Sequence, residues 1–318
     1  MVVKFIEFFY WVALLLLLAA GMPISAAAAQ VEMKPERLNV FFTDRAFLGV
    51  NPLDVEADFN VFVRTVRRTH GYQIQSTGQR IESVLDLEAI PDDDQPNLII
   101  LDSWSYLSME NTHWFEPLFV ASDRGQVSNR YLLLARREDA IKKLIDLRGK
   151  SLNLFATAKA SLGSYWLQAL FQEQKLGRPE AFFGELAYHT DPMSAVLQVF
   201  FGKKDAALVD SSKFELMAEM NPQLSGLQTL AVSEPLVNAV ICLKRSRWSS
   251  ERFKQDLIQA LTELHRDPPE RQLLTLFKVQ QLTPFEPKHL DTVRQLHEQV
   301  TFRQSEYLDP SKQLINIP

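Results

Sequence analysis

The sequence predicts an α/β fold of two lobes, each a mostly parallel sheet flanked by helices. Apolar, strand-like runs alternate with amphipathic helical segments, and this alternation occurs in two separate sets along the chain. Several of the runs end in a carboxylate. Strands that alternate with helices pair in parallel through right-handed crossovers. Two such sets therefore imply two lobes.

The N-terminus has the features of a secretory signal. Lys4 precedes an apolar run at residues 8–22, and small residues follow up to Ala29. A charged start, an apolar centre and small residues at a cleavage site characterise signal peptides. We therefore predict that residues 1–29 are a signal peptide of an exported protein. An uncleaved membrane anchor is the alternative, because about 15 apolar residues fall only slightly short of a span.

Composition excludes some classes of protein. The chain has 34 basic and 39 acidic residues and no basic block longer than residues 67–68, so we predict no nucleic-acid partner. Cys242 is the only cysteine and lies in an apolar run, which predicts a buried thiol and no disulfide framework. Without the signal, the chain is long enough for two medium domains with their own cores.

The first set of elements begins with a buried strand at residues 38–44. Asn51 and the proline after it mark the start of a helix whose apolar residues recur at i, i+3, i+4 and i+7, and Gly71 closes that helix. The set continues with a strand at residues 72–75, a short helix around residues 82–90 and a strand at residues 97–102.

The second set starts with a strand at residues 151–157. A helix then begins near Ser164 and ends at Gly177. The set continues with a helix that starts at Asp191 and is closed by Gly202, and with a strand at residues 205–210.

The remaining chain is expected to return to the first lobe. Residues 239–243 are a further apolar strand, followed by a helix with its apolar face at residues 253–264 and a second helix opened by Pro268. Because no strand is expected after them, we predict that both helices pack on the first lobe. The lobes would then be residues 30–125 with 235–318, and residues 126–234, with crossings near 121–130 and 229–239.

Polar residues follow several predicted strands, where an open parallel sheet binds its ligand. Small residues and hydroxyls before a helix let backbone N–H groups reach an anion, and a lysine there adds a full charge. The serines and aspartates also suit simple helix caps or turns. The candidate ligand-binding residues are Thr43, Asp44, Arg45, Asp102, Ser103, Tyr106, Lys159, Ser161, Gly163, Ser164, Asp210 and Ser211.

Other chemistry finds little support. The sequence contains no Walker loop, no G-x-S-x-G elbow, no H-E-x-x-H pair and no paired cysteine ligands, and the six histidines lack a metal-ligand spacing. We predict no catalytic residue, no metal and no cofactor; in an enzyme, Ser161 or His189 would be the first candidate. Arg45 is a candidate anion clamp. Four aromatic residues either stack on a ligand or pack in the core: Trp104, Tyr106, Trp114 and Phe115.

Several segments together carry a resemblance. Residues 146–154 are similar to a "DL-x-GK" segment, residues 202–211 to "G-x-x-DAA-x-V-D-S", residues 233–244 to "SEP … V-x-x-R" and residues 264–268 to "L-x-x-dP". In this order they resemble the phosphonate/phosphate-type periplasmic solute-binding proteins of ABC transporters. The loop at residues 160–163 has fewer hydroxyls than that family, and Met193 stands near the position of a common family histidine.

The resemblance implies the type 2 periplasmic-binding-protein fold. It implies a monomer that captures a small anionic solute, such as phosphate, phosphite or a phosphonate, in the periplasm and delivers it to an inner-membrane ABC permease. Ser161 and the backbone near Gly163 would hold the anion oxygens, and Asp210 would contact the other end of the ligand. A sensor that serves a membrane kinase or cyclase would have the same sequence features.

Overall fold

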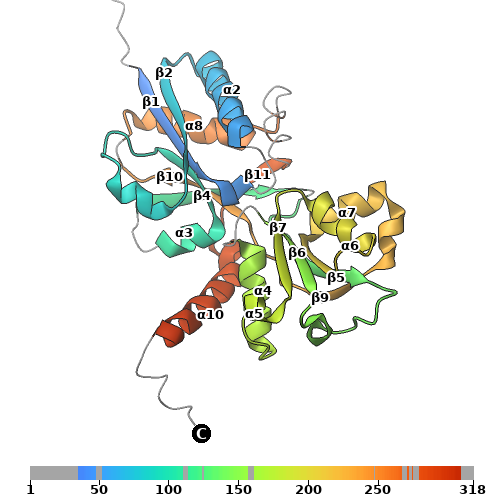
Figure 1. The fold of residues 1–318 in the computed structure, drawn as a ribbon. Coiled ribbons are helices and arrows are strands. Elements are labelled where there is room, and N and C mark those ends of the chain that lie inside the picture. The colour runs from blue at the N-terminus through green and yellow to red at the C-terminus, as the bar shows by residue number, and fades with distance from the viewer. Residues whose placement is uncertain are drawn as a thin grey trace, which may run out of the picture. The chain divides into compact units, whose positions relative to one another are not determined.

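The computed structural model describes residues 35–47, 52–109, 114–123, 125–156, 161–246, 248–266, 271, 274 and 279–308. The predicted signal peptide, residues 1–29, lies outside them, as do Asn51, Lys159 and Pro268. Two sheets organise the described residues (Figure 1). No helix in these ranges combines the length and the apolar character that a membrane crossing requires.

The first sheet has the strand order β11-β4-β10-β3-β1-β2. Its strands are β1 (Glu36–Thr43), β2 (Ile74–Ile81), β3 (Leu98–Asp102), β4 (Phe115–Ser122), β10 (Ala239–Lys244) and β11 (Gln281–Pro284). β1 pairs in parallel with β2 and β3, whereas β10 is antiparallel to both of its neighbours, β3 and β4. β11 is antiparallel to β4. Strands β1 to β4 therefore all point the same way.

The second sheet has the order β7-β6-β8-β5-β9. Its strands are β5 (Tyr131–Arg136), β6 (Ser151–Phe155), β7 (Glu185–His189), β8 (Ala206–Asp210) and β9 (Leu227–Val232). β6 is parallel to β7 and β8, and β5 is antiparallel to β8 and β9. In the first sheet β10 and the edge strand β11 therefore run against β1 to β4, and in the second sheet β5 runs against the other strands.

The predicted α/β class is confirmed, and the predicted strands correspond to β1, β2, β3, β6, β8 and β10. The expectation that no strand follows the later helices is wrong, because β11 joins the edge of the first sheet beside β4. β11 has only four residues and is largely exposed, so it lacks the apolar run of a buried strand. β7 is also a partly exposed edge strand, which explains why its sequence gave no strand signal.

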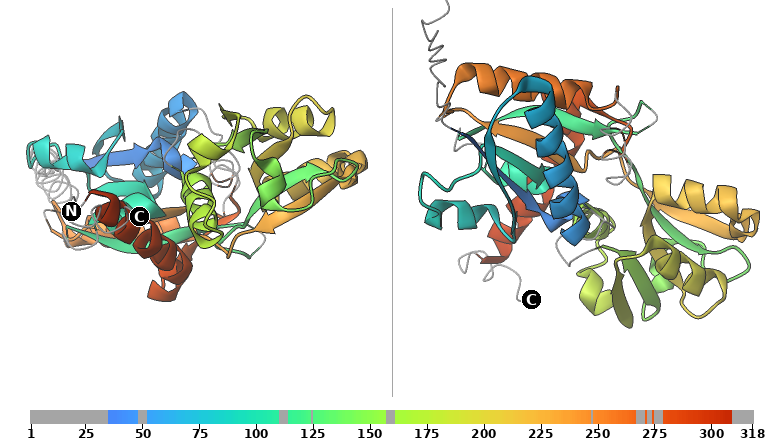
Figure 2. Two further views of the ribbon diagram at one scale, coloured as in Figure 1. Left: turned by 60° about the horizontal axis from the view of Figure 1, so that its bottom comes forward. Right: turned by 90° about the horizontal axis from the view of Figure 1, so that it is seen from above.

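The first sheet is covered on one face by α2 (Pro52–His70) and α8 (Glu251–Glu263), which lie side by side (Figure 2). Phe62 and Val66 of α2 pack in the same core as Phe253 and Leu257 of α8. α2 ends at Gly71, whose φ of 74° is the left-handed cap predicted from the sequence.

α10 (Asp291–Leu308) packs against elements of both halves of the fold. It contacts α3 (Ser103–Met109), which follows β3, and also α4 (Leu162–Glu173), which follows β6 of the second sheet (Figure 1). Its buried residues Val293 and Val300 belong to the same apolar cluster as residues of both sheets. The C-terminal helix is therefore shared by the two halves of the fold.

The second sheet has helices on both faces. α4 and α5 (Pro179–Phe182) pack on one face, and α6 (Pro192–Phe200) and α7 (Ser211–Met220) pack on the other. α4 ends at Glu173, earlier than the predicted stop at Gly177. Lys175 takes up a left-handed conformation, with φ of 56°, so the turn begins before the glycine is reached.

Asp205 ties the start of β8 to the start of β6. Its Oδ2 accepts hydrogen bonds from the Ser151 backbone N–H at 2.9 Å and from the Ser151 hydroxyl at 2.7 Å, and Lys150 Nζ lies 3.4 Å from Oδ1. Burial raises the pKa of Asp205, but these hydrogen bonds and the Lys150 charge outweigh burial and hold the pKa below its ordinary value.

The linkage between this pKa and folding predicts a pH-dependent stability. As pH falls below about 4, the unfolded chain binds a proton at Asp205 before the folded chain does, so the stabilisation by Asp205 is lost there. Asp205→Asn should lower the free energy of unfolding at pH 7 by about 1 kcal/mol. The difference from the parent should shrink as pH falls through 4 in urea titrations. Glu215→Gln, which changes an exposed carboxylate of α7, is the control; an equal, pH-independent loss in both variants would contradict this account.

Candidate functional site

A polar pocket of about 110 Å³ lies between residues of the two sheets. The first sheet contributes residues after β1, at the end of β4 and at the start of β10, and the second contributes residues at the ends of β6 and β8. The lining comprises Ala46, Phe47, Ala121, Asp123, Gln126, Val127, Asn129, Phe155, Asp210, Ser212, Lys213, Asn238, Ala239 and Val279. Strand ends of both sheets thus border one space.

Asp210 is the residue that connects the prediction with this pocket. It ends β8 and caps α7: its Oδ1 accepts from the backbone N–H of Ser212 at 2.9 Å, from the Ser212 hydroxyl at 2.6 Å and from the Lys213 N–H at 3.3 Å. Its Oδ2 receives no hydrogen bond from the described residues. Because the side chain is only 9% exposed, this oxygen is an acceptor that a ligand donor can satisfy.

The rest of the polar lining lies outside the residues that the sequence predicted. Asp123, Gln126 and Asn129 lie where the chain passes from the first sheet to the second, and Asn238 lies where it returns. These positions fall within the predicted crossings, so the crossings themselves were the available signal. Lys213 brings a positive charge to the pocket, and its ammonium forms no ion pair with the part of the chain that the structure describes.

Tyr131, the first residue of β5, joins the pocket aspartate to the N-terminus of α4. Its buried hydroxyl hydrogen-bonds with the backbone N–H of Gly163 and lies within the electrostatic reach of Asp210. Burial, and then the negative charge of Asp210, hold the pKa of Tyr131 above its ordinary range, so the hydroxyl remains neutral. No pattern in the sequence marked this tyrosine as a site residue.

Ser161, from the predicted anion loop, caps the N-terminus of α4. The Ser161 Oγ accepts from the backbone N–H of Ser164 at 3.3 Å and lies 3.0 Å from the Ser164 hydroxyl. Both side chains are buried. Gly163 is required for packing, since a Cβ there would lie 2.9 Å from Leu208 Cδ2 and 2.9 Å from Tyr131 Cε1. Lys159 falls outside the described residues.

Asp102 lies in a closed network at the end of β3. Its Oδ2 accepts from the hydroxyls of Thr43 at 3.2 Å and Ser105 at 2.7 Å and pairs with Arg45 Nε at 3.3 Å, while its Oδ1 accepts from the Ser105 N–H at 3.0 Å. The carboxylate therefore caps α3 and neutralises Arg45, the candidate anion clamp. Burial raises the pKa of Tyr165 in α4, the Arg45 charge lowers it and the Asp102 charge raises it. The pair therefore lies near the second half of the fold.

Five other predicted residues have local partners and do not line the pocket. Asp44 pairs with Arg80 at 2.7 Å, which places it at the β2 side of the sheet. The Ser103 hydroxyl donates to the Val237 carbonyl, and the Ser211 Oγ accepts from the Arg130 N–H. Tyr106 packs edge-to-face on Phe285, and Thr43 is fully buried. Among the predicted residues that the structure describes, the pocket lining includes Asp210 alone.

The four predicted aromatic residues do not form one cluster. Tyr106 and Phe115 are buried in the core, whereas Trp114 is 39% exposed. Trp104 of α3 stacks on Tyr165 of α4 with ring centroids 3.6 Å apart, and His297 of α10 contacts it at 4.6 Å. Trp104 therefore follows the packing alternative: its ring joins the two halves of the fold.

We compared the chain with protein-family models and with curated proteins. A family model described as "ABC transporter, phosphonate, periplasmic substrate-binding protein" matches residues 87–290, more than half of the chain. A search of the curated proteins found no match to the sequence.

Several solved structures share the fold at low sequence identity. A Xanthomonas citri protein bound to ATP is 14% identical, with a TM-score of 0.60 over 85% of this chain and 98% of that one. A binding protein component of an ABC phosphonate transporter from Pseudomonas aeruginosa is 13% identical, with a TM-score of 0.60 over 90% and 91%. PhnD1 of Prochlorococcus marinus in complex with methylphosphonate is 14% identical, with a TM-score of 0.58 over 84% and 99%.

The contacts of Gly163 yield a test of the site. Gly163→Ala should force the Tyr131 ring and Leu208 apart and lower the free energy of unfolding by about 1–3 kcal/mol in urea denaturation. Gly78→Ala is the matched control, because its added Cβ would meet Phe59 at an ordinary 3.6 Å. Equal stabilities of the two variants would show that Tyr131 does not pack on the N-terminus of α4 in this way.

Proposed function

Because the chain belongs to the family of periplasmic substrate-binding proteins of phosphonate ABC transporters, we propose that it captures a phosphonate-like solute between its two lobes and delivers it to its permease. Proteins of this family bind a small solute, work with an ABC permease and are periplasmic. They are solute-binding proteins and not enzymes. The family match favours this transport role over a sensory one.

One observation carries the proposal for the site: the polar pocket is bordered by strand ends of both sheets and contains a carboxylate oxygen, Asp210 Oδ2, that the described residues leave without a hydrogen bond. A ligand in this pocket touches both lobes at once, so its binding free energy favours the closed arrangement over the open one. That coupling is what a transport receptor requires.

The charges of the pocket support a dipolar ligand. Asp210 and Asp123 are acidic, and Lys213 is basic. A phosphonate group suits Lys213, because a cation stabilises an anion. A primary amine or hydroxyl at the other end of the ligand would donate to Asp210. Aminoalkylphosphonates combine both groups.

The lobes and the state of the protein follow from the same proposal. We assign residues 30–125 and 235–318 to one lobe and residues 126–234 to the other, because the chain leaves the first sheet after Ser122 and re-enters it at Ala239. Residues 1–29 act as the signal peptide for export. The protein works as a monomer without catalytic activity and without a nucleic-acid partner.

Asp210→Asn separates the helix-capping role of this residue from its proposed role in binding the ligand. The asparagine oxygen still caps α7, but the charge that would bind an amine is lost. In calorimetric titrations, 2-aminoethylphosphonate should bind the variant about ten- to a hundredfold more weakly than the parent. Methylphosphonate has no donor for Asp210 and should bind the variant no more weakly than the parent.

Asp191→Asn is the matched control for this experiment. Asp191 caps α6 at the end of β7 in the same way, but it does not line the pocket. Its substitution should leave both affinities unchanged. The proposal fails if neither methylphosphonate, 2-aminoethylphosphonate nor phosphate binds the parent chain at millimolar concentration, or if the two variants behave alike.

A further inference from the structure

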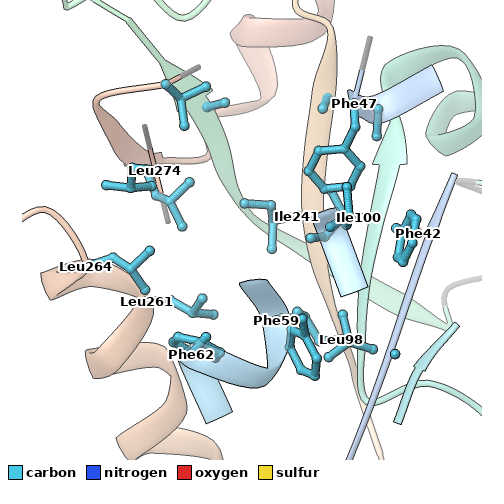
Figure 3. Close-up of a pocket in the computed structure, with 18 residues that line it drawn as sticks. Phe42, Phe47, Phe59, Phe62, Leu98, Ile100, Ile241, Leu261, Leu264 and Leu274 are labelled. Atoms are coloured by element: carbon cyan, nitrogen blue, oxygen red, sulfur yellow. The ribbon is translucent and has the colours of Figure 1, made fainter. Parts of the chain in front are cut away.

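A second space, the apolar cavity, lies beneath α2 and α8 on the covered face of the first sheet (Figure 3). Its volume is about 110 Å³, and its wall is made by side chains of β1, β3 and β10 together with both helices. Phe42, Phe59, Phe62, Leu98, Ile100 and Leu261 are among the residues that point toward it in Figure 3.

The apolar cavity adjoins the polar pocket. Five residues line both spaces: Ala46, Phe47, Ala121, Ala239 and Val279. Three of the five are alanines, whose single methyl group leaves little side chain between the two spaces. The wall that separates the pocket from the cavity is therefore thin.

The two spaces differ in what they can bind. The polar pocket contains carboxylates, amides and an ammonium, whereas the residues that line the cavity are aliphatic, aromatic or glycine. A cavity of this character stays dry, because a water molecule would find no partners there, and an apolar guest gains the contacts that the empty cavity lacks. A cavity of about 150 Å³ with such a lining holds benzene.

We propose that the apolar cavity binds the aliphatic chain of an amphiphilic anion whose head group occupies the polar pocket. The inference deepens the proposed function and rests on it, since it assigns an alkylphosphonate-type ligand with a chain of about four carbons to the same site. The head group and the alkyl chain of one ligand would lie next to each other, because the polar pocket and the cavity share five lining residues, three of them alanines. The chain adds affinity by burial, and the head sets the orientation.

An n-alkylphosphonate series from methyl to octyl tests the inference by calorimetric titration on the full chain. Each buried methylene should tighten binding about fourfold. The gain should stop near butyl or pentyl, where the cavity is full, and longer chains should bind no better.

A substitution that fills the apolar cavity tests whether the alkyl chain of the ligand lies there. Ile100→Phe adds volume at a residue that lines the cavity and not the polar pocket. It should abolish the dependence on chain length and keep the parent's affinity for methylphosphonate. Leu261→Phe, from α8, serves as a second variant if the first does not fold. Leu85→Phe, at a residue that is 72% exposed, is the control and should keep the full chain-length dependence.

The outcomes separate the two proposals. If methylphosphonate binds the parent and longer chains bind no tighter, the apolar cavity takes no ligand chain and the proposed function stands. The same conclusion follows if Ile100→Phe and Leu261→Phe keep the chain-length dependence. If no member of the series binds, the proposed function fails, and this inference fails with it.

Discussion

The placement of β10 between β3 and β4 is the constraint on which the rest of the structure depends. The chain leaves the first sheet after β4, builds the second sheet and returns as a strand antiparallel to both neighbours. Buried hydrogen bonds lock this return: the Ser103 hydroxyl donates to the Val237 carbonyl, and its N–H donates to the Asn238 carbonyl. Because two connections then cross between the sheets, residues of both crossings line one pocket.

The two aspartates that end β3 and β8, Asp102 and Asp210, have different roles in the structure. Asp102 accepts from Thr43, Ser105 and Arg45, so its charge is used within the first sheet. Asp210 uses one oxygen for the cap of α7 and leaves the other without a protein donor among the described residues. The sequence around Asp102 and the sequence around Asp210 both predict an aspartate that caps the following helix. The difference arises from neighbours distant in the chain, above all from the arginine that lies beside Asp102.

Most of the elements that the sequence predicted have continuous apolar runs or clear caps, although β4 and β5, which also contain apolar runs, were not predicted. β3 and β8 are buried on both faces, and α6 begins with an aspartate and a proline, so local pattern was enough. β7 and β11 are short and partly exposed, and their pairing comes from the sheets they join. The position of α10 was likewise not predictable, because an amphipathic helix does not specify which of two apolar surfaces it will cover.

The sequence by itself determined the α/β class, the order of the main elements and the carboxylate at the end of β8, since these depend on local periodicity and capping. Its motif order also pointed to the family that the comparisons support. Only the tertiary structure decided which polar residues share a pocket: it joined Asp210 with Lys213, Asn238 and the crossings, and it placed Tyr106 in the core. The physical reason is that a pocket is formed by residues brought together from distant segments, and side-chain spacing along one strand or helix carries no information about that pairing.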